Sequence, residues 1–340
     1  MTSSSSRPEA GVRAPVDVVL ARAVESIDET TSLPGGTSWE PKWDGYRLLA
    51  AVDADRGTTL WSRRGTDLTA AFPDIAAAVD QQVPAGTVVD GEVVVWAGER
   101  LDFAALQRRV ASPRSAARLD REQPANLVAF DVLAAGDVDL RREPFAQRRA
   151  RLEQLGSTWR PPLTLSPITQ DQAVAATWFR DLAVAGIEGL VAKGASQLYR
   201  GGQRDWLKVK QRSVLDVVCA AVVGPLARPS VVVAGLPIDG ALKIVGRTVP
   251  LSQLAARELA RVLTAGDPDD HPWPEVVSSA TVNGFGANRE PVTLTRVQPV
   301  VVEVSADVAW SGRSFRHPLR YVRVRPELHP NEVSPPPTTA

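Results

Sequence analysis

The stretch WEPKWDGYR, residues 39–47, contains a lysine in a chain that uses this residue very sparingly. Among 340 residues, with 39 lysines and arginines together, the only lysines are Lys42, Lys193, Lys208, Lys210 and Lys243. A guanidinium group stays protonated and cannot act as a nucleophile, whereas an amine can do so once it loses its proton. A lysine at position 42 therefore predicts that this position needs an amine and not merely a positive charge.

Outward from Lys42, the chain contains further short segments that combine charged, aromatic and apolar residues. They are WSRRG (61–65), VVDGEVVVW (88–96), VAFDVL (128–133), IEGLVAK (187–193), DWLKVK (205–210) and RHPLRYVRVRPEL (316–328). Together with KWDGYR (42–47), and in this order, they resemble the motifs of the covalent nucleotidyltransferases, which include DNA ligases, RNA ligases and mRNA capping enzymes. The resemblance covers roughly residues 14–330. It is closest to the small bacterial ATP-dependent DNA ligases of the LigC type and to the ligase module of LigD.

The resemblance implies a series of phosphoryl transfers that begins at Lys42. Its amine attacks the α-phosphorus of ATP and releases pyrophosphate, AMP then moves to the 5′-phosphate of nicked double-stranded DNA, and the 3′-hydroxyl finally displaces AMP. Such displacements depend mostly on positioning and on neutralising the charge of the transferring group. We therefore expect ATP and Mg²⁺ as cofactors, with Mn²⁺ as an alternative metal.

The resemblance also implies which side chains hold the nucleoside and the metal. Glu40, two residues before the nucleophile, would accept a hydrogen bond from the adenine amino group, and Phe130 would stack on the adenine ring. Arg47 would hold the ribose or the phosphate of the nick. Glu92 would hold the ribose or the metal, and Glu188 would help to bind Mg²⁺, which prefers oxygen ligands.

Several cations are expected to contact the phosphates. Lys208 and Lys210 are two apart in an expected strand, so both amines can point from one face toward the α-phosphate. We also expect their positive charges, along with a bound Mg²⁺, to lower the pKa of Lys42, because like charges disfavour the protonated form. Arg63 suits a phosphate contact through its fork of donors. Lys193 would reach the triphosphate or the DNA end.

The last segment is expected to orient pyrophosphate during the first transfer. Related ligases often have arginine and aspartate separated by one residue here, whereas this chain has Arg325, Pro326 and Glu327. We prefer Arg325 for this role because of its place before the acidic residue, with Arg320 and Arg323 as the alternatives.

Local patterns predict strands and helices in the first two thirds of the chain. We expect two strands around a turn in 46–65, a strand-rich run over 87–96 interrupted at Asp90-Gly91, and helices over 102–112, over 144–155 with Pro144 at the first helical position, and over 170–186 with Gly186 at the end. Tyr199 and Trp206 are expected to be structural. After residue 212, β-branched apolar runs around one helix, 252–266, favour a small β-barrel.

We therefore predict an α+β protein of two domains. The resemblance implies a nucleotidyltransferase (adenylation) domain of antiparallel sheets with helices over residues 14–212, and an OB-fold β-barrel over residues 213–330. Residues 1–13 and 331–340 are expected to be disordered tails, because they are rich in serine, proline and threonine.

The composition excludes some other classes of protein. The formal net charge is zero, which argues against general nucleic-acid binding by overall charge but leaves a local basic face possible. Cys219 is the only cysteine, so an internal disulfide is impossible. The three histidines show no zinc-ligand spacing. There is no run of 18 apolar residues and no signal peptide, so we expect no membrane partner. The single cysteine fits a reducing cytosol, and the resemblance to DNA ligases implies a cytoplasmic, nucleoid-associated monomer.

Two arginine-rich stretches leave two interpretations open. Arg141, Arg142, Arg148, Arg149 and Arg151 lie on or before one expected helix, and SPRSAARLDR occupies residues 112–121. The first stretch is either an ordinary solvated surface or a face that follows DNA phosphates. The second is either a flexible loop that faces DNA or a stretch without a role in binding.

Two alternatives to a DNA ligase are also considered. An RNA ligase or capping-type nucleotidyltransferase shares the lysine signature, but the residues flanking Lys42 and the β-rich C-terminal part favour a DNA ligase. A non-catalytic nick-binding protein is disfavoured by the intact lysines and carboxylates. Because Lys42 lies near the start, we expect no DNA-encircling domain before it. We therefore expect a ligase for DNA repair or recombination, with repair proteins as candidate partners.

Overall fold

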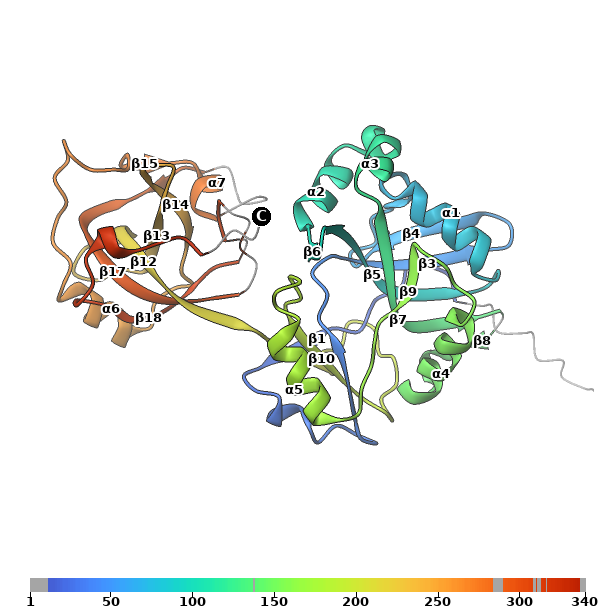
Figure 1. Ribbon diagram of the computed structural model, residues 1–340. Coiled ribbons are helices and arrows are strands. Elements are labelled where there is room, and N and C mark those ends of the chain that lie inside the picture. The colour runs from blue at the N-terminus through green and yellow to red at the C-terminus, as the bar shows by residue number, and fades with distance from the viewer. Residues whose placement is uncertain are drawn as a thin grey trace, which may run out of the picture. The chain divides into compact units, whose positions relative to one another are not determined.

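A computed structural model describes residues 12–136, 138–283, 290–307, 310, 313–315 and 317–336 (Figure 1). The chain divides into two compact units, residues 1–211 (unit 1) and residues 212–340 (unit 2). Most of the expected N-terminal tail, residues 1–11, and the last four residues of the expected C-terminal tail lie outside the described part. Within that part, no helix has the length and apolar character needed to cross a membrane.

Two sheets form the centre of unit 1. Seven of its described strands form one sheet, ordered β4-β3-β5-β7-β8, with β6 paired to β5 and β9 paired to β7. Four others form a second sheet, ordered β1-β11-β10-β2. The strands are β1 (Ala21–Val24), β2 (Thr37–Pro41), β3 (Tyr46–Asp53), β4 (Gly57–Ser62), β5 (Val88–Ala97), β6 (Arg100–Leu101), β7 (Ala125–Ala135), β8 (Val138–Asp139), β9 (Leu163–Leu165), β10 (Gly189–Gly194) and β11 (Trp206–Lys210). The pairs are antiparallel as expected, except that β1–β11 and β7–β9 are parallel.

Helices cover these sheets through apolar stripes. The helices are α1 (Pro73–Gln82), α2 (Phe103–Ala111), α3 (Ala116–Glu122), α4 (Phe145–Gly156) and α5 (Gln172–Asp181), with short 3₁₀ helices η1 (Asp28–Thr30), η2 (Thr69–Ala71), η3 (Pro113–Ser115) and η4 (Leu140–Arg142). Helix α1 buries Ile75, Ala78 and Val79, whose spacing of three and four residues places them on one face. In Figure 1, α1, α2 and α3 lie together in unit 1, and α5 lies beside β10. The mixed α+β class predicted from the sequence is confirmed.

Several predicted boundaries in unit 1 are wrong. The run 87–96 is one continuous strand, β5, because a change of register at Asp90 and Gly91 absorbs the irregularity without ending the pairing with β7. Pro144 precedes the first residue of α4 instead of occupying it. Helix α5 ends at Asp181, and turns fill the residues up to Gly186, whose φ is +79°.

The arginine-rich stretches are not uniform solvated faces. Arg148 is fully buried and forms an ion pair with the buried Asp131 at 2.8 Å, and Arg149 is also buried. These two arginines therefore cannot follow DNA phosphates on a surface, since a buried guanidinium requires a fixed partner. Residues 112–121 form η3 and most of α3 instead of a loop.

Unit 2 is built on a five-stranded sheet among its described residues, ordered β14-β13-β12-β17-β18. Its elements are β12 (Arg212–Val223), β13 (Val231–Ile238), β14 (Ala241–Arg247), β15 (Val276–Val277), β16 (Val292–Thr293), β17 (Thr295–Asp307), β18 (Arg320–Val324), α6 (Gln253–Ala260), α7 (Ser279–Asn283) and η5 (Pro330–Glu332). The predicted helix 252–266 stops at Ala260, because the chain around Ala265 pairs with Val297 of β17 instead. Val333, in the expected C-terminal tail, is buried against the core of unit 2.

Candidate active site

Lys42 lies in the loop between β2 and β3, and long-range backbone contacts hold this loop in place. The N–H of Lys42 donates to the carbonyl oxygen of Gly189 at 2.8 Å, and the N–H of Glu188 donates to the carbonyl oxygen of Lys42 at 3.0 Å. Gly45 ends the loop against β5, where a Cβ atom would lie 2.1 Å from the carbonyl oxygen of Val93. Only glycine allows this approach, so Gly45 of the first motif is required by the backbone.

The backbone contacts place the carboxylate of Glu188 directly on the amine of Lys42. The Lys42 ammonium donates to this carboxylate, and the Lys210 ammonium lies 3.6 Å from the same oxygen. Burial lowers the pKa of Lys42, but the carboxylates of Glu188, Glu92 and Asp44 outweigh burial, and the pKa lies above its usual value. The expectation that neighbouring lysines lower this pKa is therefore wrong here, because the carboxylates dominate.

Strand β11 supplies the two other lysines of the region. Burial lowers the pKa of Lys208, and the positive charges of Lys42 and Lys210 lower it further. It is therefore Lys208, and not Lys42, whose pKa falls because of its cationic neighbours.

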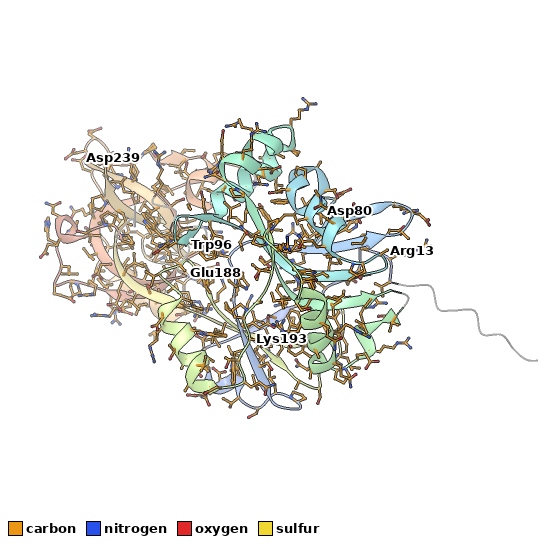
Figure 2. All side chains as sticks on the ribbon, turned by 45° about the vertical axis from the view of Figure 1, so that its right-hand side comes forward. Arg13, Asp80, Trp96, Glu188, Lys193 and Asp239 are labelled. Carbon is orange, nitrogen blue, oxygen red and sulfur yellow. The ribbon has the colours of Figure 1, made fainter. Side chains whose placement is uncertain are left out.

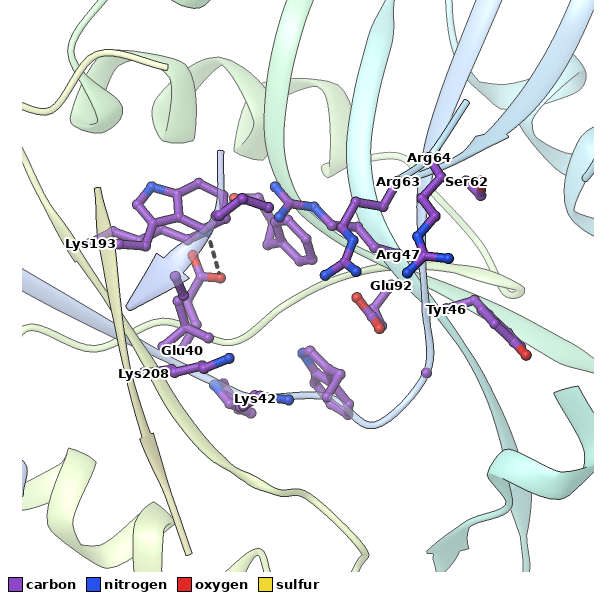
Figure 3. A pocket seen from close by; sticks show the side chains of 18 of the residues that line it. Glu40, Lys42, Tyr46, Arg47, Ser62, Arg63, Arg64, Glu92, Lys193 and Lys208 are labelled. Carbon is purple, nitrogen blue, oxygen red and sulfur yellow. Dashed lines mark hydrogen bonds and ion pairs between the residues drawn. The ribbon is translucent and has the colours of Figure 1, made fainter. Parts of the chain in front are cut away.

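A cavity of about 720 Å³ opens beside Lys42, entirely within unit 1 (Figure 3). Its wall includes the predicted site residues Glu40, Lys42, Arg47, Arg63, Glu92, Phe130, Lys193 and Lys208. Glu188 and Lys210 are not part of the wall but contact its residues as described above. A volume of this size is typical of sites for small molecules and cofactors.

One end of the cavity carries a buried ion pair flanked by aromatic rings. Lys193 donates to a carboxylate oxygen of Glu40 at 2.9 Å and to the carbonyl oxygen of Phe130 at 3.1 Å. The Lys193 ammonium also lies 4.4 Å from the ring centre of Trp206 and 4.6 Å from that of Phe130. Glu188 directly precedes β10, and Lys193 lies near the other end of this strand (Figure 2). One strand therefore positions the residues that contact Lys42 and Glu40.

Arg47 lines the cavity but is held by protein groups. Its guanidinium forms two hydrogen bonds to the buried Asp90, at 2.9 and 2.6 Å, and one to the carbonyl oxygen of Val19. Tyr199 donates to Asp90 at 2.7 Å, which agrees with the structural role expected for this tyrosine. Arg47 is therefore fixed in the wall, with the ring of Phe130 against it at 5.4 Å.

Glu92 lies on β5 opposite Arg47 in the strand register. Burial raises the pKa of Glu92 to about 8, and the charges of Lys42 and Arg47 oppose this only in part. At neutral pH this carboxyl group is therefore mostly protonated, and a further cation at this position would favour its ionised form.

Three arginines in the cavity wall have no ion pair with any described carboxylate. They are Arg63, Arg64 and Arg204, all of which are exposed. Of these three, only Arg63 was predicted from the sequence. Arg64 is the next residue of the same segment, WSRRG, and Arg204 directly precedes the segment DWLKVK, so arginines within or beside these segments were the available signal. Trp206 and Val191 also line the cavity. The sequence predicted a structural role for Trp206 and no role for Val191.

Arg325 belongs to unit 2, whereas the residues of the cavity wall all belong to unit 1. Its guanidinium contacts Asp216 at 2.9 Å, Glu303 at 3.1 Å and Glu327 at 2.6 Å. The carboxylate of Glu327 raises the pKa of Arg325, and that of Asp216 acts in the same direction. Arg323 shares Glu303 at 3.0 Å, so the two arginines compete for one carboxylate.

A family model described as "ATP dependent DNA ligase domain" matches residues 18–210, which is more than half of the chain. The chain is 32% identical to "DNA ligase C" of Mycobacterium tuberculosis, an alignment that covers 95% of this chain and 93% of that protein. It is 33% identical to "DNA ligase C2" of Mycolicibacterium smegmatis, with 92% of this chain and 91% of that protein covered.

A solved structure of a Lig E DNA ligase is similar in fold. The TM-score is 0.53 at 16% identity, and the match covers 92% of this chain and 100% of that chain. At this level of identity the likeness concerns the fold alone.

Proposed function

This chain belongs to the ATP-dependent DNA ligase family, and from that premise we propose that Lys42 is the nucleophile that takes AMP from ATP. The bond from Lys42 Nζ to the α-phosphorus forms as the bond to pyrophosphate breaks. The AMP then passes to the 5′-phosphate of nicked DNA, and the 3′-hydroxyl displaces AMP to join the strand. The observation that carries this proposal is the Lys42 amine in the wall of a cavity that also holds Glu40, Phe130 and Lys208.

The amine must lose a proton before it attacks, and Glu188 is placed to take it. Glu188 contacts the ammonium of Lys42 directly and raises its pKa, so Lys42 is protonated before the reaction begins. Transfer of the proton to the carboxylate leaves a neutral amine and a neutral acid. After attack, the nitrogen loses a second proton to water, which gives the phosphoramidate. Glu188 is thus proposed as a general base as well as a cation ligand.

The adenosine is proposed to lie at the end of the cavity formed by Glu40, Phe130 and Trp206. Glu40 accepts from the adenine amino group, and the rings of Phe130 and Trp206, which pack edge to face with centres 6.0 Å apart, offer an aromatic wall. Arg47 and Glu92 are proposed to hold the ribose. Because Asp90 already holds Arg47, this arginine offers a fixed surface instead of a mobile clamp.

The phosphates are proposed to lie among the cations of the wall. Lys208 stands beside Lys42, and Lys210 supports it from the same strand. Arg63, Arg64 and Arg204 are proposed to bind the triphosphate or the nick phosphate, because they line the cavity without a described carboxylate partner. Lys193 is assigned to Glu40 instead, since its ammonium is buried in that pair.

The carboxylates of Glu92 and Glu188 fit a magnesium ion. Among the described residues there is no group of three or more His, Cys, Asp or Glu side chains that could hold a metal. Mg²⁺ commonly uses one or two carboxylates together with substrate phosphates, and both of these carboxylates act on Lys42. When bound, the ion would neutralise charge on the phosphate oxygens. Mn²⁺ is an equivalent proposal.

Residues 14–212 are proposed as the nucleotidyltransferase domain and residues 213–330 as an OB-fold barrel. Support for a barrel comes from the ends of the five-stranded sheet, where Thr248 after β14 and Leu319 before β18 form a bridge. Bonds from Val249 N–H to Leu319 O and from Leu319 N–H to Arg247 O, each 2.8 Å, flank it. Arg325 as the pyrophosphate-orienting residue, the monomeric state, the cytoplasmic location and the role in repair stay predictions.

The proposal is tested by mass spectrometry of the intact protein after incubation with ATP and Mg²⁺. We expect one adenylate on Lys42 in the wild type and in Lys243→Ala, and none in Lys42→Ala. Lys42→Arg keeps the charge but is also expected to carry none, because arginine is not a nucleophile. An adenylate in Lys42→Ala would contradict the proposal.

The same assay separates the alternative functions. GTP in place of ATP, and nicked RNA in place of nicked DNA, test an RNA ligase or capping enzyme. A protein that binds nicked DNA but never carries a nucleotide would be the non-catalytic alternative.

A further inference from the structure

The Glu40–Lys193 pair is buried more completely than the groups expected to handle phosphates. The side chain of Lys193 is 1% exposed and that of Glu40 is 2% exposed, with 2.9 Å between the ammonium and the carboxylate. Lys193 lies on β10 and Glu40 on the neighbouring β2. The ammonium has aromatic rings on several sides, with the centre of the Phe145 ring at 4.9 Å. It is therefore committed to Glu40 and cannot serve as a mobile phosphate ligand.

The second carboxylate oxygen of Glu40 lacks a hydrogen bond. Glu40 Oε1 is buried and has no donor among the described residues, and the nearest guanidinium atom, Arg149 Nη1, is 3.6 Å away and also lacks a partner. Buried carboxylate oxygens are normally satisfied, so each exception needs an explanation. Because Glu40 lines the cavity, a bound molecule with an N–H donor can supply the missing hydrogen bond.

Glu40 is surrounded by few charges, and Lys193 contributes most to stabilising its ionised form. Burial raises the pKa of Glu40 above its usual value, and the charge of Asp131 on β7 acts in the same direction. The charge and hydrogen bond of Lys193 oppose this increase most strongly, and the charge of Arg149 opposes it as well. Arg149 acts only through charge across 3.6 Å, whereas Lys193 donates a hydrogen bond directly. Without Lys193, burial would therefore favour a neutral carboxylic acid at position 40.

We propose that Lys193 is a specificity-determining residue, which selects adenine over guanine by keeping Glu40 an ionised, acceptor-only carboxylate. The inference rests on the proposed function, which places the purine beside Glu40. An ionised carboxylate accepts from the 6-amino group of adenine but faces the 6-oxo group of guanine with oxygen against oxygen. A protonated Glu40 would carry an O–H donor, which can satisfy the 6-oxo group.

The test compares ATP and GTP as substrates of Lys193→Met across a range of pH. Methionine fills a similar volume and packs well against aromatic rings, so the change removes mainly the charge. The readout is the single-turnover rate of nucleotide transfer to Lys42, followed by intact mass. We expect the ATP-to-GTP ratio to fall about tenfold or more near pH 7, because a hydrogen bond matched to the base has been lost.

The pH dependence separates a charge effect from a loss of packing. In Lys193→Met the ratio is expected to recover as pH rises and Glu40 ionises, whereas in wild type the same change lies at lower pH, because Lys193 lowers the pKa of Glu40. The double variant Glu40→Gln/Lys193→Met has no charge to bury at either position, so it is expected to fold even if Lys193→Met does not. Its ratio is expected to be low at every pH. Lys243→Met, in unit 2, is the matched control and should behave as wild type.

Each outcome decides the inference. A folded Lys193→Met protein with an unchanged ATP-to-GTP ratio overturns it, and so does a ratio that falls equally at all pH values, which would mean only a packing role. If Lys193→Met does not fold, a double variant whose ratio equals that of wild type overturns it. Failure of the proposed function is distinct, because the wild type would then carry no nucleotide on Lys42.

Discussion

The ammonium of Lys42 and the carboxylate of Glu188 form an ion pair between residues 146 positions apart in the chain. The same two residues are joined through their backbones, because the N–H of Glu188 donates to the carbonyl oxygen of Lys42 at 3.0 Å. Gly189 adjoins the pair with φ of +136°, and a Cβ atom there would lie 2.1 Å from the carbonyl oxygen of Val209. The backbone thus fixes both the proposed nucleophile, Lys42, and its proposed proton acceptor, Glu188.

Glu188→Gln should slow the first transfer and shift its pH dependence. The carboxylate raises the pKa of Lys42, so its removal lowers that pKa and moves the alkaline rise of the rate to lower pH. Loss of the general base should reduce the rate by about 10²–10⁴. The measurement is the single-turnover rate of adenylate formation against pH, with Glu122→Gln, an exposed carboxylate on α3, as control. A slower variant with an unshifted profile would exclude Glu188 as the partner that sets the Lys42 pKa.

Glu92→Gln should stabilise the fold at high pH while it impairs catalysis. The folded protein holds a proton on Glu92 up to about pH 8, whereas the unfolded chain loses it near the usual pKa of a glutamate. The native state therefore binds more protons between these values, and this group makes stability fall as pH rises through that window. Glutamine does not ionise, so the loss of thermal stability between pH 5 and pH 8 should become smaller. Thermal unfolding of both proteins across this range is the measurement, and identical pH dependences would refute the prediction.

Arg64→Ala and Arg204→Ala should each weaken nucleotide binding, although neither was among the predicted site residues. Both line the cavity without a described carboxylate partner, so their charge is available to phosphate. A charge-assisted hydrogen bond contributes about 1.5–3 kcal/mol, so the Kd for ATP should rise roughly tenfold or more. Equilibrium binding, followed by the fluorescence of the tryptophans in the wall, is the measurement. Arg118→Ala, whose guanidinium pairs with Glu122 on the surface, should leave the Kd unchanged.

Asp216→Asn should accelerate the first transfer if Arg325 orients pyrophosphate. In the structure, Asp216, Glu303 and Glu327 hold the Arg325 guanidinium within unit 2. Loss of one partly exposed ion pair changes an equilibrium by about 0–1 kcal/mol, so we expect at most about a fivefold gain. Arg325→Ala should instead slow this step. If Arg325→Ala keeps the wild-type rate of adenylate formation, the role passes to Arg320 or Arg323, and their alanine variants decide between them.

Local sequence patterns predicted the type of most elements but not all of their ends. The strands β3 and β4 and helix α2 follow from alternation and helical spacing within a few residues. Helix α1 was not predicted, although Pro73, Ile75, Ala78 and Val79 carry its signature. The predicted interruption of β5 at Asp90-Gly91 is wrong. A bulge costs little when both neighbouring strands continue to pair, and that pairing cannot be read from the strand itself.

The sequence by itself determined the family of this protein, and it predicted a nucleophilic amine at Lys42 and eight of the residues that line the cavity. Tertiary structure alone decided what those charges contact. It placed Glu188 beside Lys42 and Lys193 beside Glu40, and it buried Arg148 and Arg149, which both interpretations of the sequence had placed on the surface. The reason is that the ionisation of a side chain, and the groups it contacts, depend on desolvation and on partners far away in the chain. The local pattern of residues encodes neither the desolvation nor the distant partners.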